Sequence, residues 1–332
     1  MIGARLWIAL CTGWILASAA HASEEFIGMR NYSPFAHVYG LPVFADATVL
    51  DPRQTSVAFA TTIVSHSDLG VLPAEAVALD GEAYITDLAL SYGVSERLTV
   101  GITLPWIAYN GGVFDGAIEW WHDLWGFPNG VRDAQPDDEL LIGYSRDGAS
   151  EFLLDSSASG LGDVRMAAAY RLAGSAESDF GLVLRGGVKL PTGEAEKLRG
   201  SEAADFSLDV AVRRAFALPR GELVLLADAG ALILGNGEVL SGLQRDTVGF
   251  AGAGAMWRLS ERWRFNLQFY GQTSYFRSDL DELGSDSLSI TVGGSYTWVK
   301  SRMRLSLGVV EDLIDDINPD IGVRIALSKE IR

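Results

Sequence analysis

From Thr55 to the end of the chain, apolar residues alternate with polar or small ones. The pattern is clearest between Tyr84 and Trp106, where two alternating arms flank Ser95-Glu96-Arg97. In the second arm Leu98, Val100, Ile102, Leu104 and Trp106 share one parity, and Thr99, Gly101 and Thr103 share the other. Because successive side chains of a strand point to opposite faces, each arm has one apolar face. The stretch therefore predicts an antiparallel hairpin.

Similar alternation recurs in about twelve segments, an even number, as expected for a bacterial barrel made from one chain. Connections of two lengths separate these segments. Short ones such as Ser260 to Arg262 alternate with longer ones such as Ser65 to Gly81, Pro191 to Ala204 and Tyr275 to Asp286. Short periplasmic turns opposite longer external loops are typical of a membrane barrel, and a soluble sandwich has no reason to show them. The predicted fold class is all-β, a transmembrane antiparallel β-barrel over residues 55–332 with a short helix in one long loop.

The first 22 residues have the form of a secretory signal peptide. Arg5 precedes an apolar stretch from Leu6 to Ala17, and Ala20-His21-Ala22 has the small-x-small form of a cleavage site. No later segment offers about 18 consecutive apolar residues, so a helical membrane protein is excluded. The one cysteine, Cys11, lies inside this signal, which excludes disulfide scaffolds. Export leaves a soluble periplasmic protein or an outer-membrane barrel, and the alternation favours the bacterial outer membrane.

Residues 23–54 lack clean alternation and form a separate N-terminal segment. Aromatic and apolar residues are mixed with turn formers in Asn31-Tyr32-Ser33-Pro34-Phe35 and in Tyr39-Gly40-Leu41-Pro42. Three interpretations stay open: a plug inside the barrel, a cover on its periplasmic mouth, or a disordered leader. The apolar content makes disorder the weakest of the three.

Charge is distributed unevenly between the whole chain and the predicted inner wall. The formal net charge of −17 excludes nucleic acid as a partner, because its phosphates require Lys and Arg. Several charged residues nevertheless alternate with predicted lipid-facing ones and should face the lumen: Arg165, Arg185, Lys189, Arg213, Arg264, Arg304 and Arg324, against Asp87, Asp209 and, less clearly, Asp228. Such a basic wall fits a channel for anionic or polar solutes. It equally fits a narrow lumen filled by Arg–Asp networks and the N-terminal segment.

The longest connection runs from Pro105 to Gly162, and loops of this length usually act in function or as lids. A short helix is predicted from Phe114 to Phe127, with helical spacing of its apolar residues. Its candidate loop or lid residues are Phe114, Asp115, Ile118, Trp121, His122 and Trp125. This connection and the N-terminal segment are the two places where a partner protein is expected, besides contacts with outer-membrane lipids and lipopolysaccharide.

Catalytic, metal and cofactor sites are not predicted. His66-Ser67-Asp68 contains the residue types of a hydrolytic triad, but consecutive strand residues cannot aim at one another, and triads assemble from separated positions. The acidic loop clusters, such as Asp137-Asp138-Glu139, follow no calcium-loop spacing. His122 has no second histidine at metal-ligand spacing.

Several motifs together resemble a proteobacterial outer-membrane family, domain of unknown function 3187. The resemblance rests on the two N-terminal motifs above, on Gly111 to Asp115 with Ile118, Trp121-His122 and Gly126 to Pro128, on Gly160 to Asp163, on Lys189 to Gly193, and on Glu311 to Leu313 before Pro319-Asp320. It covers nearly the whole mature chain. The resemblance implies an outer-membrane barrel and no particular substrate.

Three functions follow as hypotheses. The leading one is a channel or transporter for a small polar, possibly anionic, solute. The alternative is a structural or adaptor barrel that anchors a partner complex, and the weakest is an outer-membrane hydrolase.

Overall fold

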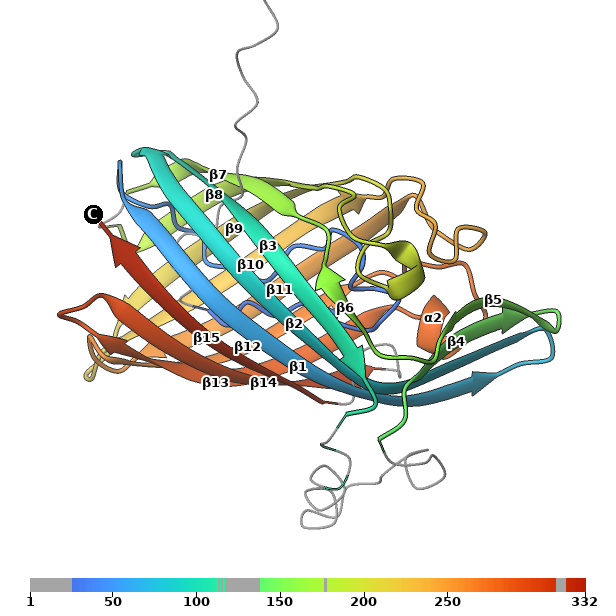
Figure 1. Cartoon of the computed structure of the whole chain (residues 1–332). Coiled ribbons are helices and arrows are strands. Elements are labelled where there is room, and N and C mark those ends of the chain that lie inside the picture. Colours follow the sequence, from blue (N-terminus) through green and yellow to red (C-terminus); the bar gives the residue numbers. More distant parts are fainter. Residues whose placement is uncertain (1–25, 113, 115, 117–137, 176–177, 315–320) are drawn as a thin grey trace, which may run out of the picture.

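The computed structural model describes residues 26–112, 114, 116, 138–175, 178–314 and 321–332. Within these residues, twelve antiparallel strands close into a barrel. They are β1 (Thr55–Val71), β2 (Glu75–Ser95), β3 (Leu98–Asn110), β7 (Arg165–Gly174), β8 (Phe180–Lys189), β9 (Asp205–Ala217), β10 (Glu222–Ile233), β11 (Thr247–Arg258), β12 (Trp263–Gln272), β13 (Ser287–Trp298), β14 (Met303–Ile314) and β15 (Ile321–Ile331). The predicted fold class is confirmed (Figure 1). The predicted signal peptide, and the predicted loop helix apart from Phe114 and Gly116, lie outside the described residues.

The barrel closes because the first and last strands pair along their length. Thr55 lies opposite Ile331 and Ser65 opposite Ile321, and the remaining strands pair with their neighbours in chain order. The shortest junction joins β3 to β7, from Leu98 opposite Tyr170 to Thr103 opposite Arg165. Closure satisfies the backbone hydrogen bonds of every barrel strand without leaving an edge in lipid.

Side-chain exposure follows the predicted alternation. Outward residues such as Phe59 (55% exposed) and Leu267 (42%) alternate with buried inward ones such as Ala60 and Gln268. Exposed aromatic side chains occur near both ends of the strands, for example Trp106 at one end and Trp263 at the other. Among the described residues, no helix has the length and apolarity needed to cross a membrane.

One predicted connection is wrong. Ser65 to Gly81 was expected to be a long polar loop, but β1 and β2 continue as a paired hairpin to Val71 opposite Ala76. β4 (Leu141–Arg146) and β5 (Ala149–Leu154) extend this hairpin into a small sheet beyond the barrel (Figure 1). Glu82, a polar outward residue there, is buried beside Gly112 and accepts from the Phe114 N–H. β6 (Ala158–Leu161) pairs with the end of β3.

Residues 26–54, here called the lumen segment, lie inside the barrel. The segment begins beside β12, and its middle, from Ser33 to Tyr39, lies near the long loops at one end of the barrel. It then returns to the other end, where the short turns lie (the turn end), and there Arg53 and Gln54 exchange backbone hydrogen bonds with Gly93. Its apolar side chains pack against a wall of inward glycines: Phe44 against Gly252, Phe26 and Phe44 against Gly254, and Ile27 against Gly293 and Gly308. A side chain at these glycines would occupy the volume that the segment fills.

Candidate functional site

The tip of the lumen segment contacts the loops at one end of the barrel. The Tyr39 hydroxyl donates to the carbonyl of Val239 (3.1 Å), and the Phe35 ring packs edge-on against Phe152. His37 Nε2 and the Tyr109 hydroxyl are hydrogen-bonded. Burial, together with the positive charge of Arg30, holds the pKa of His37 well below its usual value of 6.5. The imidazole is therefore neutral inside the barrel.

Polar side chains of the wall hold the backbone of the segment at successive levels. Gln268 both accepts from the Ile27 N–H (3.2 Å) and donates to the Ile27 carbonyl (2.6 Å). Tyr270 donates to the Pro42 carbonyl (2.8 Å), and Thr99 accepts from the Leu50 N–H (2.7 Å). These bonds satisfy backbone groups of a segment that has no regular secondary structure.

Arg185 is the centre of the first ionic cluster. Its guanidinium contacts Asp209 (2.6 Å) and Asp228 (2.5 Å), and it also donates to the Ala45 carbonyl of the lumen segment (2.6 Å). The cluster forms because Asp209 lies directly opposite Arg185 in the β8–β9 register. One cation is thus shared by two carboxylates and one backbone carbonyl.

Lys189 is the centre of a second cluster, which also has two carboxylates for one cation. Its amine contacts Asp163 (2.5 Å) and Asp205 (3.3 Å). Asp205 also accepts from the Gly40 N–H of the lumen segment (2.8 Å), and Asp163 accepts from the Thr192 and Gly193 N–H groups (2.9 and 2.7 Å). The sequence pattern did not indicate either aspartate. Asp163 lies just before β7, and Asp205 is the first residue of β9, so neither lies within an alternating run of apolar and polar residues. The motifs Gly160 to Asp163 and Lys189 to Gly193 were the available signal.

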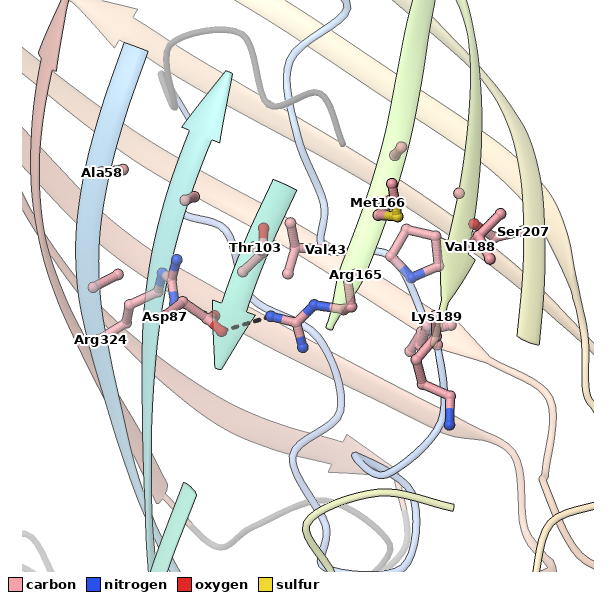
Figure 2. Close-up of a pocket in the computed structure, with 17 residues that line it drawn as sticks. Val43, Ala58, Asp87, Thr103, Arg165, Met166, Val188, Lys189, Ser207 and Arg324 are labelled. Atoms are coloured by element: carbon pink, nitrogen blue, oxygen red, sulfur yellow. Dashed lines mark hydrogen bonds and ion pairs between the residues drawn. The ribbon is translucent and has the colours of Figure 1, made fainter. Parts of the chain in front are cut away.

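The third cluster has the opposite stoichiometry. Asp87 contacts Arg165 at 2.6 Å and Arg324 at 3.9 Å, and Arg324 also donates to Thr62 (3.0 Å). Two guanidinium groups therefore share one carboxylate. Figure 2 shows Arg165 reaching from β7 toward Asp87 on β2.

The structure places the remaining predicted wall residues on the inner side as well. Arg213 lies 3.8 Å from Asp46 of the lumen segment. Arg264 and Arg304 both donate to the Thr297 hydroxyl (2.8 and 3.3 Å). Asp46, Asp163 and Asp205 offset much of the predicted basic charge, so the wall carries both signs.

Two cavities lie beside the lumen segment. The central cavity, about 70 Å³, is lined by residues 40–43 of the segment and by small and charged side chains of the surrounding strands, among them Asp87, Arg165 and Lys189 (Figure 2). The turn-side cavity, about 380 Å³, is lined by residues 47–51 and by charged residues near the short turns. Arg185 contacts Ala45, which lies between the part of the segment that lines the central cavity and the part that lines the turn-side cavity.

The predicted loop residues are only partly described. The Phe114 N–H donates to Glu82 (2.7 Å), and the Phe114 side chain is 39% exposed. Asp115, Ile118, Trp121, His122 and Trp125 lie outside the described residues.

The described residues meet the requirements of neither a His66-Ser67-Asp68 catalytic triad nor a metal site. β1 directs Ser67 to the face opposite His66 and Asp68, so the three residues do not form a triad. No group of three or more His, Cys, Asp or Glu side chains within the described residues could hold a metal ion.

A family model described as "Protein of unknown function (DUF3187)" matches residues 5–331. The chain belongs to the DUF3187 family. The resemblance inferred from the sequence motifs is thereby confirmed. No curated protein matches this DUF3187 sequence.

Solved structures place the DUF3187 barrel among outer-membrane folds. The COG4313 outer membrane channel from Pseudomonas putida F1 is 12% identical with a TM-score of 0.55, over 86% of this chain and 98% of that one. The Pseudomonas putida toluene transporter TodX is 11% identical with a TM-score of 0.38, over 93% and 99%. The similarity to the COG4313 channel establishes the fold. At 12% identity it does not establish a substrate or a mechanism.

Proposed function

We propose that this DUF3187 protein is a channel of the bacterial outer membrane for a small polar solute. The observation that supports it best is that the central and turn-side cavities both lie beside the lumen segment, against residues 40–43 and 47–51 respectively. Elsewhere the segment packs against inward glycines of β11, β13 and β14. The proposed conduction path runs beside the segment through these two cavities.

Membrane insertion is supported by the outer surface. Apolar side chains such as Phe59, Leu267 and Leu307 are exposed on the faces that alternate with the lumen. A soluble protein would bury such a continuous apolar belt, whereas lipid stabilises it. Lipids and lipopolysaccharide of the outer membrane are the proposed surroundings.

Between the two cavities the proposed path passes the Arg185 cluster. There the guanidinium bridges two wall carboxylates and the Ala45 carbonyl, and Arg213 approaches Asp46 one level toward the turns. These polar contacts close the path by side chains, which can rearrange faster than the whole segment could leave the lumen. A polar solute can replace the bonds it breaks here, but a hydrocarbon cannot.

The proposal is tested by recording currents from the purified, folded protein in planar bilayers. We expect discrete, small current steps, because the lumen segment leaves only a side path. A preparation unfolded by heat serves as the control and should give no steps. A folded barrel without current steps at any voltage would contradict the proposed function.

A further inference from the structure

The central cavity faces an excess of positive charge. Its described lining residues carry three cations, Arg165, Lys189 and Arg324, and a single carboxylate, Asp87. Lys189 is compensated by Asp163 and Asp205, which lie behind the lining. Arg165 and Arg324 both contact Asp87, the one carboxylate among the described lining residues.

Arg165 is the most accessible of these charges. Its side chain is 19% exposed, compared with 8% for Asp87 and 4% for Arg324. Its one hydrogen bond to a described residue runs from Nη2 to Asp87 Oδ1. A guanidinium has five N–H donors in a fixed fork, so most of the donors of Arg165 are available to a ligand in the cavity.

The lumen segment adds a third guanidinium to this region. Arg30 donates to the carbonyls of His37, Tyr39 and Leu41 and interacts electrostatically with Asp87. The clusters at Arg185 and Lys189 have the reverse balance, with two carboxylates for each cation. Cations therefore outnumber carboxylates among the described residues that line the central cavity.

We propose that the central cavity is a binding site for a carboxylate group of the solute, received by the guanidinium of Arg165. This inference rests on the proposed channel function and names its substrate class. Arg165 binds the carboxylate through its paired N–H donors, and Asp87 orients the guanidinium from the other side. Arg324 adds charge without direct contact.

The size and floor of the cavity agree with such a ligand. A volume of about 70 Å³ holds several water-sized groups, enough for a carboxylate and a short stem. The floor is formed by Ala58, Ala60, Ala89, Ala167 and Gly187, whose short side chains leave the space in front of Arg165 open.

The test measures binding and current separately on the full-length protein. Acetate is titrated into the purified barrel by calorimetry, with acetamide as the uncharged analogue and methylammonium as the cation. We expect acetate alone to bind. Arg165→Ala should weaken acetate binding about tenfold or more, because a charge-assisted hydrogen bond is lost. Asp87→Asn should strengthen it, because the competing carboxylate loses its charge.

Arg304→Ala is the matched control, since Arg304 faces the lumen but does not line the cavity. Its acetate binding should equal that of the natural protein. Equal binding of acetamide, or acetate binding that survives Arg165→Ala, would overturn the carboxylate site even if the barrel conducts. Acetate binding with the expected variant pattern but no bilayer current would support the site and contradict the channel.

Discussion

Replacing Arg185 with alanine is expected to destabilise the barrel by about 3–5 kcal/mol, the usual cost of breaking a buried ion pair. The substitution leaves Asp209 and Asp228 without their shared cation, and their side chains are only 2% and 1% exposed. It also removes the donor to the Ala45 carbonyl. Denaturant unfolding of the purified protein in micelles measures the loss.

Two further variants separate charge from packing in this experiment. Arg185→Ala combined with Asp209→Asn and Asp228→Asn should recover part of the loss, because no buried charge is left without a partner. Arg214→Ala on the outer face of β9 should leave the midpoint nearly unchanged, since Arg214 is exposed and contacts the Phe216 ring. Equal destabilisation by the Arg185 and Arg214 variants would refute the assigned role.

Deleting residues 27–50 is expected to raise the single-channel conductance by on the order of tenfold, because a lumen of twelve strands lies between filled and open barrels. The deletion keeps Arg53 and Gln54, which exchange backbone hydrogen bonds with Gly93 near the short β2–β3 turn. Bilayer recording of the shortened and intact proteins makes the comparison.

Gly254→Leu gives the same test without shortening the chain. Its side chain would meet the rings of Phe26 and Phe44, so it should loosen the segment and raise conductance to a smaller extent. Gly186→Leu is the matched control, because only Leu208 Cδ1 and the Ser207 carbonyl lie near its Cβ position, both at 3.9 Å. Unchanged conductance in a folded deletion variant would show that the segment does not occlude the lumen.

Most of the barrel could be predicted from the sequence because lipid and lumen impose a period of two on every strand. The turn at Ser95 to Arg97 and the alternation of short and long connections follow from the same constraint. The β1–β2 extension could not be predicted this way. Its outward residues Ser65, Ser67, Asp80 and Glu82 are polar yet buried, so the local pattern resembles a loop.

The candidate site was predictable only in part. The alternation of apolar and polar residues indicates which strand residues point inward, including Asp228 and Arg264. It does not provide the strand register that sets Arg185 against Asp209 and Lys189 against Asp205. The path of the lumen segment was likewise not readable, because it is set by side-chain contacts such as Ile27 with Gln268, 241 residues apart.

The central claim is that solute passes beside the lumen segment while the segment stays in place. A disulfide between Ile27→Cys and Gly308→Cys tests it, because Ile27 Cβ lies 3.4 Å from the Cβ position of residue 308. Natural disulfides join Cβ atoms about 3.5–4.5 Å apart, so small adjustments allow the bond. The crosslink pins the start of the segment to β14, and β1 already holds its end.

The deciding measurement is the single-channel conductance of this double variant before and after reduction. Passage beside the segment predicts equal current steps in the oxidised and reduced protein. Current that is absent in the oxidised protein and appears only after reduction would contradict the account, because it would mean that the segment must leave the lumen for the channel to open.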